Sequence, residues 1–141
     1  MTPRLTAADI ACWVLKSARL PDLMAEGWVP GGEVELARCV RPSYRLDLVE
    51  PGQPVLLWCS GRVDPGVHAT GTVAGPVEGS DDGPVVVVRW RRLATPVPRE
   101  ALLTDPVART AEVVRMPAGS NPSWLSPPQW QAVRALSPSW G

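Results

Sequence analysis

The apolar positions of this chain come in short runs, a pattern that favours brief β-strands over long helices. Valine, leucine and tryptophan form compact blocks or alternate with polar residues, and glycine or proline bounds most of the blocks. The predicted strands are residues 11–16, 33–40, 55–60, 66–74, 84–93 and 111–116. The predicted short helices are residues 20–28, 43–49, 99–104 and 127–136, with one further turn capped by Thr6 and Asp9.

The clearest local signal is a hairpin in the middle of the chain. Residues 55–60 and 66–74 read as two strands joined by the turn 61–65. Alternation places Leu56, Trp58 and Ser60 on one face of the first strand. A ring and a hydroxyl could therefore line one cavity, although strand tryptophans usually belong to the core.

Short strands with a few short helices predict an α+β fold, a small mixed β-barrel of five to six strands that is partly open. The 141 residues suffice for one domain with a real core. We predict a flexible leader at residues 1–10, one folded domain at residues 11–136 and a tail at residues 137–141.

Composition and charge restrict the classes of molecule that the protein could bind. Fourteen basic residues balance fourteen acidic ones, so no overall positive field attracts a phosphate backbone, and sequence-blind nucleic-acid binding is disfavoured. The N-terminus has no apolar signal region, and no apolar run approaches the ~20 residues of a membrane span. We therefore expect a cytoplasmic protein without membrane contact.

Few residues are suited to metal binding or catalysis. A zinc site would need Cys12, Cys39, Cys59 and His68, yet no Cys-x-x-Cys pair occurs, so we expect no metal and no cofactor. No acidic pair lies beside a serine or cysteine in a nucleophile elbow. We expect a non-enzyme, and Lys16 with a nearby acid leaves a catalytic alternative open.

Five segments resemble, in the right order, the EVE domain of the PUA-like superfamily, which is related to the YTH readers of N6-methyladenine. They are residues 13–17 (WVLKS), 40–45 (VRPSYR), 51–61 (PGQPVLLWCSG), 66–73 (GVHATGTV) and 115–125 (RMPAGSNPSWL). The likeness spans roughly residues 11–136. Two positions depart from it: Gln53 replaces an acid, and Arg38 replaces a residue that is often aromatic in bacterial relatives. If that aromatic belongs to a base cage, the cage is altered here.

The resemblance implies a reader, a monomeric binding module that holds a modified base of DNA or RNA in a pocket on the barrel wall. Because some family members accompany bacterial defence nucleases, it also implies a defence-system partner protein. Such a pocket needs a flat apolar face and a few fixed polar groups. The residues that we expect around the base are Lys16, Ser17, Ser43, Tyr44, Trp58, Ser60, Asn121, Ser123 and Trp124. The arginines that we expect to contact phosphates are Arg38, Arg41, Arg45, Arg89 and Arg91.

Each of these residues also has an ordinary structural interpretation. Tyr44 can pack its ring on the barrel, Asn121 precedes proline as in many turns, and a run of charges is usually a solvated face. Two other functions stay open. One is a nucleic-acid-processing enzyme like those of the related ASCH domains, and the other is a protein-interaction module that binds no nucleotide.

Overall fold

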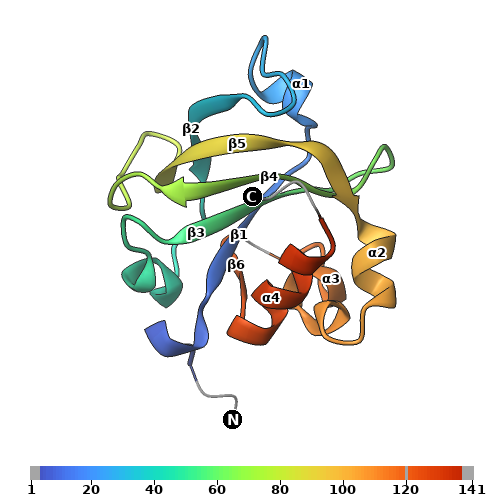
Figure 1. Cartoon of the computed structure of the whole chain (residues 1–141). Helices are drawn as coiled ribbons and strands as arrows, with labels where there is room; N and C mark the ends of the chain where they lie inside the picture. Colours follow the sequence, from blue (N-terminus) through green and yellow to red (C-terminus); the bar gives the residue numbers. More distant parts are fainter. Residues whose placement is uncertain (1–3, 120, 138–141) are drawn as a thin grey trace.

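The computed structural model describes residues 4–119 and 121–137 and contains a six-stranded mixed sheet. Its strands are β1 (Cys12–Ser17), β2 (Glu33–Cys39), β3 (Pro54–Cys59), β4 (Gly66–Val73), β5 (Val85–Pro98) and β6 (Ser123–Leu125). They follow the order β2-β5-β4-β3-β1-β6, in which β1 is parallel to β3 and the other pairs are antiparallel. The sheet is strongly curved, as Figure 1 shows, and the predicted α+β fold is confirmed.

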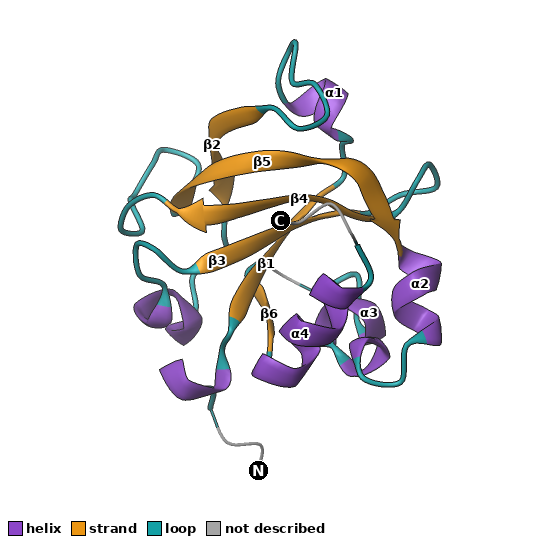
Figure 2. Ribbon diagram, in the orientation of Figure 1, coloured by secondary structure: helices purple, strands orange, loops and turns teal. Residues whose placement is uncertain are grey.

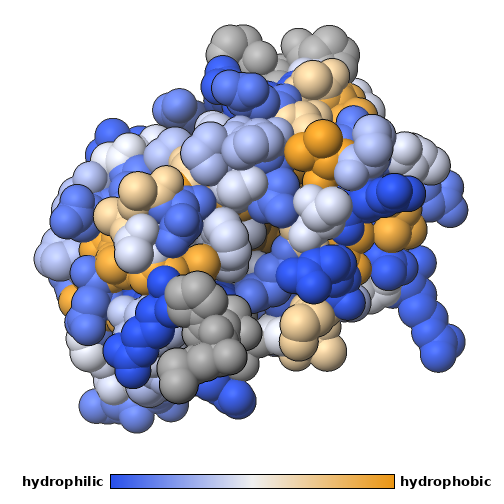
Figure 3. Space-filling model, turned by 90° about the horizontal axis from the view of Figure 1, so that it is seen from below, coloured by the Kyte–Doolittle hydropathy of each residue, from blue (hydrophilic) through white to orange (hydrophobic). Residues whose placement is uncertain are grey.

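Most of the short helices lie below the sheet in the view of Figure 2, whereas α1 (Pro21–Met24) lies at the top, beside β2. The α-helices are α1 (Pro21–Met24), α2 (Arg99–Thr104), α3 (Glu112–Arg115) and α4 (Pro127–Ala135). The 3-10 helices are η1 (Ala7–Asp9), η2 (Tyr44–Leu48) and η3 (Ala108–Thr110). Helix α4 begins at a capping box, in which the Ser126 hydroxyl accepts from the Gln129 N–H and the Gln129 side chain accepts from the Ser126 N–H. Seen from below, the molecule carries mostly hydrophilic side chains with small, separate apolar patches (Figure 3).

The predicted strand at residues 111–116 is wrong, because this segment forms helix α3. Val113 and Val114, which favour strands by propensity, are both buried there. The helix packs against η3 and β6, so tertiary burial outweighs the local preference of valine. Strand β6 lies in a segment without a predicted element, and β5 continues to Pro98, past its predicted end at residue 93. The other predicted strands are present as β1 to β5.

Both faces of the central strands are buried, which explains the apolar runs of β1 and β3. On the side of the helices, one core cluster includes Val14, Trp58 and Leu102. A second cluster, inside the curve of the sheet, includes Trp13 and Leu57. Lys16, which follows the alternation of Val14, therefore lies on the helix side of β1.

Gln53 organises the turn that enters β3. Its Oε1 accepts from the Trp13 indole N–H at 2.7 Å and from the Glu50 N–H at 2.7 Å, and its Nε2 donates to the Leu48 carbonyl at 3.1 Å. A carboxylate could accept the first two bonds but could not donate the third. Glutamine, at a position where the resemblance implies an acid, therefore fits this turn and also anchors a core tryptophan.

The ends of the chain fall partly outside this description. Residues 7–9 form the predicted helical turn, in which the Thr6 N–H donates to Asp9 Oδ2 at 2.8 Å. Residues 1–3 of the predicted leader and residues 138–141 of the predicted tail lie outside the described residues. Within residues 4–119 and 121–137, no helix is long and apolar enough to cross a membrane.

Candidate functional site

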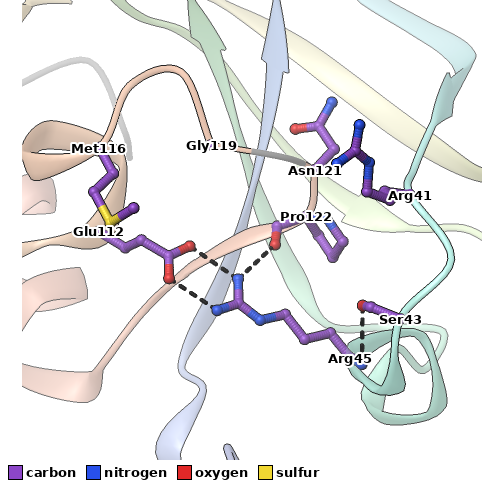
Figure 4. A pocket seen from close by; sticks show the side chains of 8 residues that line it. All are labelled: Arg41, Ser43, Arg45, Glu112, Met116, Gly119, Asn121 and Pro122. Carbon is purple, nitrogen blue, oxygen red and sulfur yellow. Dashed lines mark hydrogen bonds and ion pairs between the residues drawn. The ribbon is translucent and has the colours of Figure 1, made fainter.

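Three cavities surround the carboxyl end of β1. Cavity A, of about 290 Å³, is lined by Arg41, Ser43, Arg45, Glu112, Met116, Gly119, Asn121 and Pro122 (Figure 4). Cavity B, of about 250 Å³, is lined by Ser17, Ala18, Arg19, Met24, Leu36, Ala37 and Arg38. Cavity C, of about 220 Å³, is lined by Trp58, Ser60, Gly61, Pro65, Arg99 and Pro117. A lining residue of each cavity makes a hydrogen bond to the backbone of Lys16 or Ser17, so the three cavities converge on one end of the barrel.

The Asn121 side chain joins two strands that share no ladder. Its Oδ1 accepts from the Lys16 N–H at 2.7 Å, and its Nδ2 donates to the carbonyls of Lys16 and Cys39 at 3.2 and 3.4 Å. The Arg41 N–H also donates to the Asn121 carbonyl at 2.9 Å. Asn121 thus links β1 to the end of β2 and holds the barrel together at this point. Its amide is engaged by the backbone, where the sequence suggested that it reads a base.

Arg45 and Glu112 form a bidentate ion pair on the wall of cavity A (Figure 4). The two guanidinium nitrogens lie 2.9 and 2.8 Å from the carboxylate oxygens, and Arg45 also donates to the Pro122 carbonyl at 2.9 Å. The Ser123 hydroxyl donates to Glu112 Oε1 at 2.9 Å. Arg45 is therefore committed to Glu112, and the fully buried Ser123 orients that carboxylate.

These contacts shift the ionisation of two side chains. Hydrogen bonds from Arg45, above all, hold the pKa of Glu112 below its ordinary value, although burial opposes this shift. Burial lowers the pKa of Lys16, and the Glu112 charge partly offsets that effect. The Lys16 Nζ donates to the carbonyls of Gly119 and Met116 at 2.7 and 3.4 Å. Cavity A is thus bordered by several cations and by one carboxylate that stays ionised at neutral pH.

We expect Glu112→Gln to lower the free energy of unfolding by about 1–2 kcal/mol at pH 7, because Arg45 loses its charged partner. The folded-state pKa of Glu112 lies below its unfolded value. Its contribution is therefore present above the unfolded pKa of about 4.3 and is lost as the pH falls through the folded pKa. Urea unfolding at a series of pH values from 7 downward measures the difference between wild type and variant, which should shrink below about pH 4.3.

Glu35→Gln is the matched control for this prediction. Glu35 forms an exposed pair with Arg89 at 4.0 Å, so its loss should change the unfolding free energy by less than about 0.5 kcal/mol. A Glu112→Gln difference that is the same at pH 7 and at acidic pH would contradict the role assigned to this carboxylate.

The ring of Tyr44 is covered by the N-terminal segment of the chain. The Arg4 guanidinium lies over this ring, 4.8 Å from its centroid, and the Leu5 N–H donates to the Tyr44 hydroxyl at 2.9 Å. Trp124 is half-buried against the inner core and pairs with Trp13 across β1 and β6. Neither Tyr44 nor Trp124 lines cavity A, B or C.

Trp58 and Ser60 do border one cavity, cavity C, as the hairpin alternation suggested. However, Trp58 is only 1% exposed and belongs to the helix-side core, so its ring is not presented as an open stacking face. The Ser60 N–H donates to the Ser17 carbonyl at 2.9 Å and so fixes the ends of β1 and β3 together. For Trp58 the structure supports the interpretation as a core residue.

The five arginines proposed as phosphate contacts lie on separate surfaces. Arg38 lines cavity B and donates to the Lys16 carbonyl at 2.9 Å, while Arg41 and Arg45 line cavity A. Arg89 and Arg91 lie on β5, and β4 and β3 separate that strand from β1. The structure therefore brings together Arg38, Arg41 and Arg45 and places the other two elsewhere.

Several residues that line the cavities could not be recognised from the sequence pattern. Ala18, Met24 and Leu36 in cavity B read as ordinary loop and strand positions. Glu112 was not recognised as a site residue, because its segment was predicted to be a strand and no partner for its carboxylate was evident in the sequence. Its partner Arg45 stands 67 residues earlier in the chain, so only the folded structure pairs the two.

The candidate zinc ligands do not form a metal site. Within the described part of the chain, no group of three or more His, Cys, Asp or Glu residues could hold a metal ion. Cys12 and Cys59 belong to different core clusters. Burial raises the pKa of Cys12, and it raises the pKa of Cys59 to about 12, so neither thiol is a ready thiolate ligand.

Solved structures match this fold over nearly the whole chain, whereas no family model and no curated protein matches it. A hypothetical protein from Leishmania major has a TM-score of 0.71 at 16% identity, over 93% of this chain and 96% of that one. A protein from Pseudomonas syringae has a TM-score of 0.67 at 12% identity, over 89% and 99%. Human THYN1 protein, solved in complex with 5-methylcytosine-containing DNA, has a TM-score of 0.59 at 14% identity, over 89% and 96%.

At these identities the likeness concerns the fold, and at that level it confirms the resemblance recognised in the sequence. The chain has the fold that the resemblance to EVE domains implied, and it shares this fold with the DUF55 domain of human thymocyte nuclear protein 1.

Proposed function

We propose that this protein is a reader, a non-catalytic module that binds nucleic acid by holding one modified base in cavity B. The observation that carries the proposal is the make-up of this cavity. Met24 and Leu36 provide apolar walls, and Ala18, which follows β1, lines the cavity between them and Arg38. That human THYN1 protein was solved with 5-methylcytosine-containing DNA supports a nucleic-acid ligand for the shared fold.

Arg38 supplies the flat surface that cavity B otherwise lacks. Among the described residues no aromatic ring lines cavity B, and the guanidinium of Arg38 is held in place by its bond to the Lys16 carbonyl. Bases stack on arginine guanidinium planes as well as on aromatic rings. Arg38 stands at the position that is often aromatic in bacterial relatives, and in this proposal its guanidinium takes the place of a stacking ring.

A hydrogen-bond donor is also available at the cavity. The backbone N–H of Ala18 has no acceptor among residues 4–119 and 121–137, and Ala18 lines cavity B. A donor fixed at this place can bond to a carbonyl or ring nitrogen on the edge of a base. Cavity B therefore combines a stacking plane, apolar walls and an edge contact.

The expected discrimination is modest if the modification is a methyl group. One buried methyl contributes about 0.8 kcal/mol, which corresponds to about a fourfold preference. A modification that adds a hydroxyl can give more, because a base without it leaves a polar group of the cavity unpaired. An experiment must therefore resolve a fourfold difference.

The test is a titration with oligonucleotides that carry one methylated or hydroxymethylated base, against unmodified oligonucleotides of the same sequence. We expect at least one modified oligonucleotide to bind about fourfold tighter or better, and we expect this ratio to persist as salt rises while every affinity falls. Equal binding to all oligonucleotides, lost together at higher salt, would leave no reader function.

The catalytic alternative rests on Lys16 and Glu112, whose charges interact beside cavity A. Both groups make hydrogen bonds within the protein, Lys16 to two carbonyls and Glu112 to Arg45 and Ser123, and these contacts favour a structural role for the pair. Incubation with the same oligonucleotides, followed by analysis for cleavage or base release, distinguishes the two functions. Turnover that is lost in Lys16→Ala would favour the enzyme.

A further inference from the structure

Cavities A and B share a wall at a single carbonyl group. The Lys16 oxygen accepts from Arg38 Nη2, on the side of cavity B, at 2.9 Å. The same oxygen accepts from Asn121 Nδ2, on the side of cavity A, at 3.2 Å. A ligand in one cavity is therefore separated from the other cavity by one layer of side chains. A nucleotide is large enough to reach across this layer.

The charge around cavity A differs from that of the whole chain. The chain as a whole is neutral, with fourteen basic and fourteen acidic residues. Cavity A is bordered by Lys16, Arg41 and Arg45, and Glu112 is the one acidic residue that lines it. Glu112 is neutralised by its bidentate pair with Arg45, so a local positive charge remains.

Two donors of cavity A have no acceptor within the described residues. The Arg41 side chain is exposed and forms no ion pair or hydrogen bond with residues 4–119 and 121–137. The Ser43 hydroxyl accepts from the Arg45 N–H at 3.2 Å, and its own hydrogen has no acceptor in the same part of the chain. Figure 4 shows both residues on the segment before η2, across the cavity from Glu112 and Met116.

We infer that cavity A is a phosphate subsite, which binds the phosphodiester group next to the base in cavity B through Arg41 and Ser43. This inference rests on the proposed function. An arginine and a hydroxyl are common donors to phosphate oxygens, and the local positive charge suits a single negative charge. The neutral net charge of the chain is consistent with this arrangement, since one phosphate is held at one place.

The experiment compares two versions of a modified oligonucleotide, one natural and one with a neutral methylphosphonate linkage beside the modified base. Wild-type protein should bind the neutral version about tenfold more weakly. Arg41→Gln should bind the natural version about tenfold more weakly and should no longer distinguish the two. Its slope of log affinity against log salt should be shallower by about 0.7, as expected for one contact to a single strand. Ser43→Ala should show the same trend with a smaller loss.

Arg89→Gln is the matched control, because Arg89 is an exposed arginine on β5, away from β1. It should leave affinity, salt slope and the response to the neutral linkage unchanged. The preference for modified over unmodified bases should survive in Arg41→Gln, since cavity B is intact.

The two proposals fail in different ways. If the protein prefers the modified base but Arg41→Gln and the neutral linkage have no effect, the phosphate subsite is wrong and the reader function stands. If no modified oligonucleotide is preferred, the reader function falls, and the phosphate subsite falls with it.

Discussion

The Ala18→Trp variant is expected to keep its fold and to lose at least about tenfold in affinity for the modified oligonucleotide, because its indole would occupy the space of the base. Ala18 lines cavity B and is exposed, so a larger side chain there displaces no core residue. A base that stacks contributes about 1–3 kcal/mol, and a filled cavity removes this contribution. Fluorescence anisotropy with the modified oligonucleotide measures the loss, and thermal unfolding checks the fold.

Thr72→Trp is the matched control for this substitution. Thr72 is also exposed and lines a different cavity, of about 320 Å³, beside Arg89 and Arg91 on β5. The control should bind like wild type. If Ala18→Trp binds with unchanged affinity, or if Thr72→Trp loses as much, the base does not lie in cavity B.

Trp58→Ala is expected to lower the free energy of unfolding by about 3–5 kcal/mol, the largest stability effect that we predict. The side chain is 1% exposed and packs in the helix-side core with Val14 and Leu102. Because small domains are stable by only about 5–15 kcal/mol, the variant should melt far below wild type. Urea unfolding measures the difference.

Tyr44→Ala provides the comparison for Trp58→Ala. It removes one hydrogen bond from the Leu5 N–H and the contact with Arg4, and should lower the free energy of unfolding by only about 1 kcal/mol. If Trp58→Ala instead kept its stability and lost binding, the ring would belong to a ligand site in cavity C.

The strands that were predicted correctly each carry a hydrophobic pattern that can be recognised from a short stretch of sequence. Apolar runs or alternation, bounded by glycine and proline, located both ends of β1 to β4 and the start of β5 within one residue. The errors arose where local and tertiary preferences differ. Val113 and Val114 suggested a strand but form a helix, because packing against η3 and β6 decides their conformation.

The candidate site was harder to predict from the sequence than the strands were. The segments around Lys16, Ser17, Ser43 and Asn121 meet at the end of β1 in the folded chain. The contacts that each side chain makes there could not be predicted from the sequence. Asn121 and Arg45 looked like groups for a ligand, and both are engaged by the protein itself.

The sequence by itself therefore determined the fold class and most of the strands, because hydrophobic periodicity and turn residues act over short stretches of chain. Only the tertiary structure decided which polar groups stay available to a ligand. The hydrogen bonds that engage Asn121, Arg45 and Tyr44 join residues 105, 67 and 39 positions apart. A bond across such distances depends on how the strands and loops pack. The donors of Arg41 and Ala18, which have no acceptor in the described part of the chain, could therefore be recognised only in the folded structure.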